Sequence, residues 1–444
     1  MKILKKVIEY GLYVLVFLLP IQTRLIIREF TTGPQGTVGW GFVEYPSIGI
    51  YGIDILLMVL LLLFFTQFLI EFKKGVMKPI PLWQWLLAAF DFFIFISLLF
   101  SFDKILSLYR YFLFLLGTGL FFLIVRAEYN RNKLFLTFFS AIFLQSLLAI
   151  WQFLSQKTFA FKWLGLASHL PIDLGTSVVE VSSKGERWLR AYGGFDHPNI
   201  LGGAVAIGLV IFVWLFVKEK IKIKAAYYYL LFTVCFLGLI FSFSRSSWGG
   251  FTLALLFILA VCMIKKDWRA QTKILKTILL SVVLFAVIFF QYSDLFVTRL
   301  AGEGRLEIKS DYERSYFLNE SRDIIKDNIL FGTGIGNYTT QTIKERKNDY
   351  FWTFQPVHNT FLLVLAEIGI FGFLFFTLFL AWIVFYSFEK KEFLNLSILI
   401  ILFIIMLYDH WLWSLHFGIM FFWLVMGLLF KNIKFKKYVQ GRKT

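Results

Sequence analysis

The residues of this sequence that are best suited to chemistry are arginines and one histidine at the ends of strongly apolar segments. Arg245 stands between Ser244 and Ser246 in a short link between two apolar runs. A guanidinium is the preferred partner of phosphate because its donors form a fixed fork. The neighbouring serine hydroxyls can satisfy backbone groups and orient this guanidinium. The alternative interpretation is an arginine that only marks the membrane boundary.

A histidine opens another apolar run nearer the carboxyl end of the chain. His358 is followed by Asn359, and an imidazole at such a boundary titrates near neutral pH and can act as a general base. Glu367 lies nine residues further along, which on a helix is about half a revolution away. We therefore expect Glu367 to face elsewhere and to have a structural role. A polar residue at the membrane interface is the alternative interpretation of His358.

Other polar residues stand at the boundaries of further apolar runs. Pro198 suits a first helical turn, so Asp196 or His197 is expected to cap the helix that follows. Asp409 and His410 join the last two apolar runs beside tryptophans that are typical of a membrane interface. A helix start and an interfacial belt are the simpler interpretations of these two segments.

Three charged residues are harder to assign from position alone. Arg314 lies in a long polar segment, where a surface arginine is the simplest interpretation. Arg110 lies near one end of its apolar run. Asp91 is in the middle of a run with no evident partner, so we expect only a polar contact that faces the bundle interior.

Composition places these residues in a membrane protein. The chain of 444 residues is 59% hydrophobic with a mean hydropathy of +0.73, which no soluble domain of this size can bury. The net charge of +17 would favour nucleic acid binding in a soluble protein, but here it gathers in short loops. We therefore predict membrane lipids as partners and no nucleic acid.

Motifs for metals, cofactors and redox chemistry are missing from the sequence. Cys235 and Cys262 both fall within apolar runs and form no zinc spacing or disulfide framework. The glycines of segment 332–336 lack the Lys-Ser/Thr ending of a P-loop. We predict no metal and no cofactor.

Apolar runs of helical length recur along the whole chain. The first run resembles a signal peptide but has no small-residue cleavage site, so we expect it to be retained as a helix. The fold class predicted is an all-α polytopic membrane protein with about a dozen transmembrane helices in one transmembrane domain over residues 1–444. The predicted helices are 7–27, 51–70, 82–101, 106–125, 134–154, 198–217, 226–243, 247–264, 275–291, 360–387, 393–408 and 411–430.

Basic residues predict the orientation of these helices. Lysine and arginine gather in alternate short loops, which places those loops in the cytoplasm. The N-terminus and the basic tail 431–444 are then cytoplasmic, and segments 28–50, 155–197 and 292–359 lie on the outer side of the inner (cytoplasmic) membrane. The last of these is a large, partly helical outer loop between the ninth and tenth helices, with an amphipathic helix expected at 321–330.

In this orientation the unusual polar residues share the outer side. Arginines imply an anionic substrate that carries phosphate, and the absence of nucleotide and metal motifs implies a donor that is already activated. A sugar linked to a lipid diphosphate fits, because its tail stays in the bilayer while its head group reaches the outer surface. The residues therefore predict a membrane site that is open to the outside.

Four motifs in chain order resemble those of the O-antigen ligase and polymerase superfamily, bacterial membrane proteins that handle polysaccharides. The resemblance covers most of the chain and implies a GT-C-like fold. The four are residues 190–199 (RAYGGFDHPN), residues 244–248 (SRSSW), Arg314 with 331–337 (FGTGIGN), and residues 358–372 (HNTFLLVLAEIGIFG).

The resemblance implies roles for individual residues in a metal-independent, inverting glycosyltransferase. Its donor would be an undecaprenyl-diphosphate-linked glycan, and its acceptor a lipid or another cell-surface molecule. Arg245 and Arg314 would bind the diphosphate and stabilise the leaving group, and His358 would orient or deprotonate the acceptor hydroxyl. The predicted substrate-binding residues are Arg110, Arg190, His197, Asn199, Asn359, Asp409 and His410.

Four functions remain open at this point. A ligase would pass a finished glycan to a surface acceptor, and a polymerase would extend glycan chains from the same donor. A protein O-oligosaccharyltransferase often carries extra sequence after its last helix, whereas here a basic tail follows. A polysaccharide transporter should show charges through the mid-membrane or internal repeats, and only Asp91 lies that deep.

Overall fold

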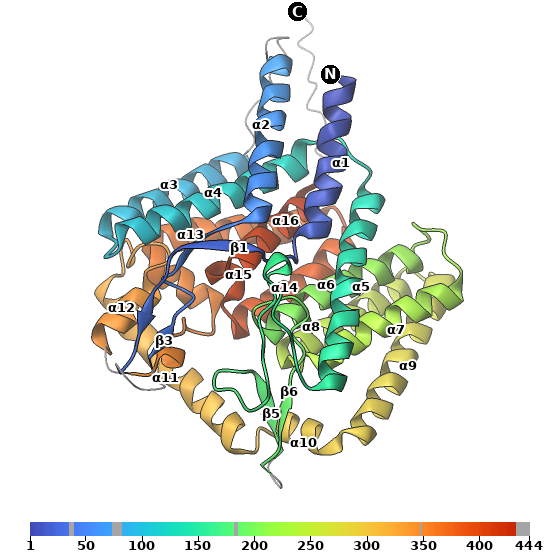
Figure 1. The fold of residues 1–444 in the computed structure, drawn as a ribbon. Coiled ribbons are helices and arrows are strands. Elements are labelled where there is room, and N and C mark those ends of the chain that lie inside the picture. Colours follow the sequence, from blue (N-terminus) through green and yellow to red (C-terminus); the bar gives the residue numbers. More distant parts are fainter. Residues whose placement is uncertain (35–39, 73–81, 182–184, 347–348, 432–444) are drawn as a thin grey trace, which may run out of the picture.

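The structure is a computed structural model that describes residues 1–34, 40–72, 82–181, 185–346 and 349–431, and it is built mostly from helices (Figure 1). A helix occupies at least part of every apolar range predicted to be helical. These helices are α1 (Lys2–Leu18), α2 (Gly52–Phe72), α3 (Leu82–Phe100), α4 (Lys104–Arg126), α5 (Arg131–Ser155), α6 (Pro198–Val217), α7 (Ala225–Phe241), α8 (Arg245–Ile264), α9 (Trp268–Gln291), α13 (Thr360–Glu389), α14 (Phe393–Tyr408), α15 (Trp411–Ser414) and α16 (His416–Lys431).

Length and apolar composition identify the membrane-spanning helices. Within the described residues, α2, α3, α4, α5, α6, α8, α9 and α13 are long and apolar enough to cross a bilayer. Helices α7, α14 and α16 are apolar but shorter. The chain is therefore a multi-pass helical membrane protein, while the number of spans near twelve and the GT-C-like arrangement stay predictions.

The first helix is shorter than predicted. It ends at Leu18 rather than at residue 27, because Pro20 has no backbone N–H and disfavours helical geometry just before it. Residues Arg24–Arg28 instead form strand β1, which pairs antiparallel with β4 (Ile48–Tyr51). Two further short antiparallel pairs join β2 (Thr31–Thr32) to β3 (Gly41–Phe42) and β5 (Val178–Glu180) to β6 (Arg187–Leu189).

The last predicted helix is broken into two. Leu415 has an extended backbone that separates α15 from α16. Gly418 packs so tightly under this break that an added Cβ would lie 1.7 Å from the carbonyl oxygen of Trp411. Only glycine permits this close turn, which sets the position of the segment that carries Asp409 and His410.

Helix α13 also contains a break that the sequence did not predict. Gly369 adopts a φ of 68°, so the carbonyls before it lose their helical partners. The glycine turn at 332–336 supplies new donors, because Thr333 N–H donates to Ala366 O and Gly334 N–H donates to Glu367 O, both at 2.9 Å. The turn predicted there therefore connects segment 292–359 to helix α13 through these backbone hydrogen bonds.

Segment 292–359 is mostly helical. It contains α10 (Ser293–Ala301), α11 (Arg305–Asp327), α12 (Tyr338–Glu345) and the short 3₁₀ helix Phe351–Thr353. Helix α11 is much longer than the predicted 321–330, and Gly302 and Gly304, both with positive φ, separate it from α10. This bend brings the first turns of α11 back against α10.

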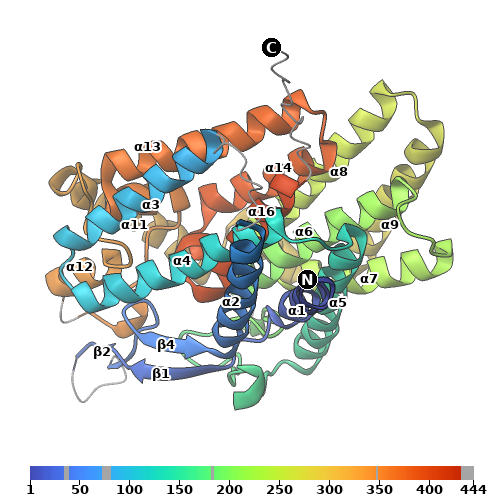
Figure 2. The same cartoon turned by 90° about the horizontal axis from the view of Figure 1, so that it is seen from above.

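Figure 2 shows how the helices are grouped. Helices α3, α4 and α13 lie on one side, α7, α8 and α9 lie on the other, and α6, α14 and α16 run between them. Helix α6 is almost wholly buried. The amino-terminal ends of α6 and α13 and the short α15 therefore come together beside segment 292–359, and this is where the polar residues gather.

Candidate functional site

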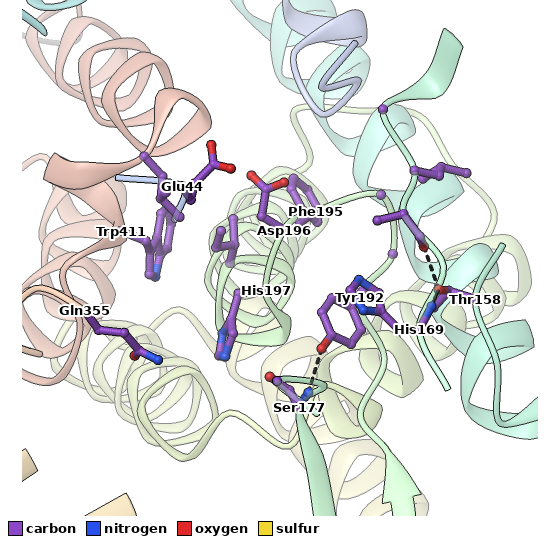
Figure 3. Close-up of a pocket in the computed structure, with 18 of the residues that line it drawn as sticks. Glu44, Thr158, His169, Ser177, Tyr192, Phe195, Asp196, His197, Gln355 and Trp411 are labelled. Atoms are coloured by element: carbon purple, nitrogen blue, oxygen red, sulfur yellow. Dashed lines mark hydrogen bonds between the residues drawn. The ribbon is translucent and has the colours of Figure 1, made fainter. Parts of the chain in front are cut away.

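A cavity of about 440 Å³ lies where these helix ends meet the neighbouring loops (Figure 3). Two other hollows of about 390 and 590 Å³ lie along α5 and α1 and are lined by apolar residues and lysines with little else. The polar lining of the central cavity includes Glu44, Asp196, His197, His358, Asp409 and His410. The structure thus brings four of the predicted site residues, from three distant parts of the chain, into one space.

His358 and Asp409 face each other across two chain segments that are fastened together. Thr360 Oγ1 donates to Asp409 O at 2.8 Å, which joins the start of α13 to the end of α14. His358 Nδ1 lies 3.9 Å from Asp409 Oδ1, and His410 N–H donates to the same oxygen at 2.8 Å. His358 Nδ1 is buried and has no hydrogen bond within the described residues. The imidazole is therefore held beside a carboxylate with a ring nitrogen unused.

The local environment determines the charges around His358. Burial lowers the pKa of His197 and that of His410 to about 3, so both imidazoles are neutral near pH 7. Burial alone would raise the pKa of Asp409, but the interaction with His358 holds it well below its usual range. Asp409 is thus a carboxylate that can stabilise a positive charge on His358.

A chain of hydrogen bonds runs from this carboxylate to a buried arginine. Asn199 Nδ2 donates to Asp409 Oδ2 at 2.7 Å, and Arg190 Nη2 donates to Asn199 Oδ1 at 2.6 Å. His197 caps α6, as predicted, by accepting from Asn199 N–H at 3.1 Å. Burial, and then the positive charges of Arg299 and Arg314, lower the pKa of Arg190. Arg190 therefore lies at the edge of a group of guanidiniums.

The other members of this group come from α8, α10 and α11. Arg299 Nη1 donates to both carboxylate oxygens of Glu307 at 2.6 and 2.8 Å. Arg245 donates to the carbonyl of Arg299 at 3.3 Å and lies 3.5 Å from Glu307 and 3.7 Å from Asp311. We call Arg190, Arg245, Arg299 and Arg314 the arginine cluster. Two carboxylates face four guanidiniums, so the cluster has positive charge to spare.

Arg314 stands in the middle of α11 and completes this cluster. Its positive charge contributes to lowering the pKa of both Arg190 and Arg299. Its Nε is buried and has no hydrogen bond within the described residues. Arg314 is therefore the member whose donors are least committed to the protein.

The serines around Arg245 satisfy backbone groups, as predicted, but no hydrogen bond joins them to the Arg245 guanidinium within the described residues. Ser242 Oγ donates to Leu239 O at 2.7 Å, and Ser244 Oγ bonds Ser247 Oγ at 2.9 Å. Serine hydroxyls are short and reach nearby backbone first. The Arg245 guanidinium instead contacts Arg299 in α10 and Glu307 and Asp311 in α11.

Sequence reasoning missed Arg299 and Glu307, which are both almost fully buried. They are eight residues apart, but the bend at Gly302 and Gly304 separates them. A helical spacing rule therefore cannot pair them. The sequence feature that could have indicated a buried arginine is the position of Arg299 close to the apolar Leu295 and Phe296, in a segment expected to be a loop.

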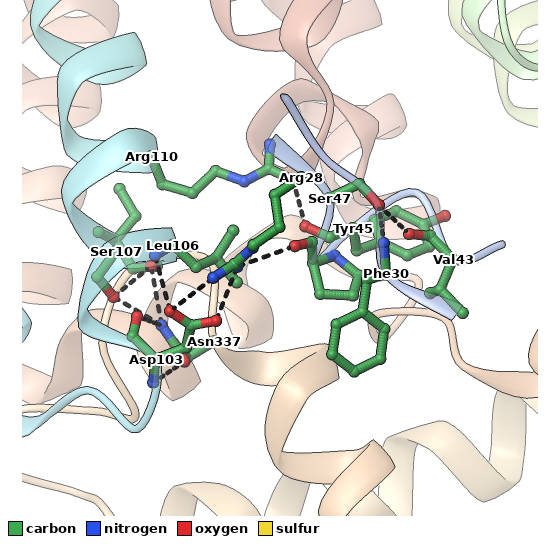
Figure 4. A network of polar contacts seen from close by, with 12 residues as sticks. Arg28, Phe30, Val43, Tyr45, Ser47, Asp103, Leu106, Ser107, Arg110 and Asn337 are labelled. Atoms are coloured by element: carbon green, nitrogen blue, oxygen red, sulfur yellow. Dashed lines mark hydrogen bonds and ion pairs between the residues drawn. The ribbon is translucent and has the colours of Figure 1, made fainter. Parts of the chain in front are cut away.

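Four of the seven predicted substrate-binding residues do not line the cavity: Arg190 and Asn199, described above, and Arg110 and Asn359. Arg110 donates to Ser414 O at 2.9 Å and to Tyr45 O at 2.5 Å, next to a network around Asp103 and Asn337 (Figure 4). Its neighbourhood is a second, much smaller cavity of about 20 Å³.

Asn359 caps α13, because its Oδ1 accepts from Leu362 N–H at 3.0 Å, and its Nδ2 donates to Leu407 O at 3.2 Å. Both ends of its amide are thus used within the protein. Glu367 accepts from Trp413 Nε1 at 2.8 Å and does not line the central cavity, as its predicted structural role requires. Substrate binding by Arg110 and Asn359 stays a prediction.

His358, Asp409 and His410 also offer the donor atoms of a possible metal site. One ligand atom from each lies within 4.8 Å of the others. However, His410 Nδ1 already bonds Ser414 Oγ at 2.7 Å, and both Asp409 oxygens accept hydrogen bonds from the protein. A metal would have to compete with these bonds.

Comparison with known proteins agrees with the class that the site defines. The fold is that of a multi-pass membrane protein with a polar site at the ends of its helices. Residues 230–377 match the family model described as O-antigen ligase, and the resemblance to the O-antigen ligase superfamily is thereby confirmed. No curated protein matches the chain. The matched residues include Arg245, Arg314 and His358, whereas Arg190 and Asp409 lie outside them.

Proposed function

We propose that this protein transfers a glycan from an undecaprenyl-diphosphate-linked donor to a cell-surface acceptor, with inversion and without a metal. The observation that supports this most directly is the chain of contacts from the arginine cluster through Asn199 to Asp409 and His358. This chain of contacts connects the arginine cluster, which would bind the anionic leaving group, to His358, which would accept the proton. The family match supports glycan transfer of the O-antigen ligase or polymerase type.

The proposed reaction is a single displacement at the anomeric carbon. His358 takes the proton of the acceptor hydroxyl, and Asp409 stabilises the imidazolium that forms. The acceptor oxygen bonds to the anomeric carbon as the bond from that carbon to the phosphate oxygen breaks. The polyprenyl diphosphate leaves with the electron pair, and the arginine cluster stabilises its negative charge.

The proposed location is the outer face of the cytoplasmic membrane, with both chain ends in the cytoplasm. The distribution of basic residues in short loops supports this orientation. The tail 432–444, on which part of that prediction rests, lies outside the described residues. A lipid-linked donor needs access from the bilayer, and helix ends beside a large polar segment provide a suitable boundary.

A transfer assay with purified protein in detergent and a lipid-linked glycan tests the proposal. We expect transfer that survives a chelator and is lost in His358→Ala and in Arg245→Ala. Full activity in both variants would overturn the assignment of the site. Activity that returns only with an added divalent ion would instead favour a metal at His358, Asp409 and His410.

The length of the product separates the two enzymes that use this donor. A ligase yields one transferred glycan for each acceptor, whereas a polymerase yields a ladder of longer chains. We propose the ligase reaction first, with the polymerase and the protein O-oligosaccharyltransferase as alternatives. Sizing the labelled product on a gel distinguishes the first two, and supplying a serine-containing peptide as acceptor tests the third.

A further inference from the structure

The side of the cavity formed by Glu44 and Asp196 differs in charge from the arginine cluster. Glu44 accepts from Arg24 Nη2 at 2.8 Å, so these two charges are paired. Asp196 is exposed to the cavity and has no hydrogen bond from its side chain to another described residue. Figure 3 shows the two carboxylates near each other, with His197 pointing the opposite way from Asp196. This side of the cavity therefore carries one negative charge to spare.

A buried donor group without a partner also faces the cavity. Trp411 is only 2% exposed and lines the cavity, yet its Nε1 has no hydrogen bond within the described residues. Figure 3 shows this indole extending into the cavity beside Gln355. A buried N–H without an acceptor is unfavourable, and a ligand oxygen that accepted from it would remove that penalty. The indole thus points to a ligand independently of the carboxylates.

The remaining lining fits a saccharide. The half-buried ring of His169 lines the cavity and is stacked on the buried ring of Tyr192, with the two centroids 4.4 Å apart. Sugar rings present C–H faces that pack on such planes and hydroxyls that donate to carboxylates. The amide of Gln355 can both donate and accept. Aromatic planes, acceptors and one unused donor are the groups that a sugar requires.

In-line geometry assigns this side to the acceptor. In an inverting displacement, the attacking oxygen and the leaving oxygen lie on opposite sides of the anomeric carbon. With the diphosphate at the arginine cluster and His358 at the attacking hydroxyl, the rest of the acceptor extends away from the cluster. Figure 3 shows Glu44 and Asp196 on the side away from the His197 ring, and that ring is hydrogen-bonded to Asn199, which links to Arg190 of the cluster.

We propose that Glu44, Asp196 and Trp411 form an acceptor subsite that binds an uncharged or amine-bearing saccharide and rejects one that carries carboxylates. This inference rests on the proposed function, because that function places the diphosphate at the other end. A carboxylate brought beside Asp196 would meet a like charge in an enclosed space. The subsite therefore selects the acceptor by charge as well as by shape.

Binding of defined oligosaccharides to the purified full-length protein tests the proposal. The probes are the uncharged N-acetylglucosamine tetramer, its deacetylated amine form and tetragalacturonate, titrated by microscale thermophoresis at neutral pH. We expect the first two to bind at least about tenfold more tightly than the third. Equal or tighter binding of tetragalacturonate, or no saccharide binding, would overturn the proposal. Binding of a serine-containing peptide in place of all three saccharides would also overturn it.

Substitutions at two different positions are tested, so that a folding defect in one variant does not decide the result. Asp196→Asn and Glu44→Gln should each reduce the preference over tetragalacturonate, to about threefold or less. Asp323→Asn is the matched control, because it removes the same charge from an exposed position on α11. An unchanged preference in both well-folded cavity variants would contradict the inference.

Donor binding on the same preparations separates this inference from the proposed function. A polyprenyl diphosphate should bind the wild-type protein and both cavity variants equally well. If it binds while saccharide preference is absent, the subsite is wrong and the proposed function stands. If it does not bind while saccharide preference follows Asp196, the donor assignment is wrong.

Discussion

The arginine cluster and the side of the cavity formed by Glu44 and Asp196, the carboxylate side, differ in how their charges are balanced. In the cluster, Glu307 holds Arg299 and lies near Arg245, so the protein supplies part of the negative charge that these arginines need. On the other side, Asp196 faces open space with no hydrogen bond to another described residue. The cluster is preorganised by its own counterions, whereas Asp196 is left for a ligand.

From this difference we infer which side chains can be substituted without destabilising the fold. A group that is tied to internal partners cannot be removed without leaving those partners unsatisfied. A group that faces empty space can be altered with little cost to folding. Arg299 belongs to the first kind and Asp196 to the second, and Arg314 is half-buried, with a buried Nε that has no hydrogen bond within the described residues.

The largest effect on activity is expected at Arg314. Arg314→Ala removes donors that the protein itself uses little, so the leaving diphosphate loses stabilisation, and kcat should fall by about 100-fold or more. Arg322→Ala is the matched control, because Arg322 lies exposed on the same helix, bonded to Asn319 at 3.2 Å. Steady-state transfer with the lipid-linked donor measures both. Similar rates in the two variants would remove Arg314 from the proposed site.

Stability should be affected most at Arg299. Arg299→Ala leaves the buried Glu307 without its closest partner, and breaking such a pair costs about 3–5 kcal/mol. The double change Arg299→Met with Glu307→Leu removes both charges and should recover much of this loss. Thermal unfolding in detergent compares the two. If the single variant melts like the wild type, the ion pair does not organise the cluster.

A smaller effect is expected where the two regions are joined. Asn199→Ala breaks the link between Arg190 and Asp409, so His358 loses part of its orientation while the diphosphate site stays whole. We expect kcat to fall about tenfold with little change in donor affinity. Asn319→Ala, at an exposed position of α11, serves as the control. A change in donor affinity alone would show that Asn199 belongs to the cluster and not to the link.

The sequence predicted the helices well because apolar length and loop charge are local properties. It also placed His197, His358, Asp409 and His410 on one side of the membrane, and the structure brings them into one cavity. It could not pair Arg299 with Glu307, since a chain bend and tertiary packing join them. Nor could it bring Glu44 to Asp196, because β1 was predicted as the end of a helix and the loop position of Glu44 depends on β1 and β4.

The smallest effect concerns pH and acts only on the carboxylate side. The cavity walls remove solvent from Asp196, although its side chain faces the cavity. This desolvation, together with the charge of Glu44 and against that of Arg24, raises the pKa of Asp196 to about 6. Asp196 is therefore charged above that pH and becomes neutral as the pH falls through it. Tetragalacturonate keeps its own charge in this range.

Discrimination against tetragalacturonate should consequently be full near pH 7.5 and should weaken severalfold near pH 5.5. Arg24, whose pKa is raised, keeps its charge across this interval. Asp196→Asn should show weak discrimination at both values, with no pH dependence. Binding of the uncharged tetramer should stay level and provides the reference. Discrimination that weakens equally in Asp196→Asn would assign the titration to another group, and discrimination that strengthens on acidification would contradict the charge argument itself.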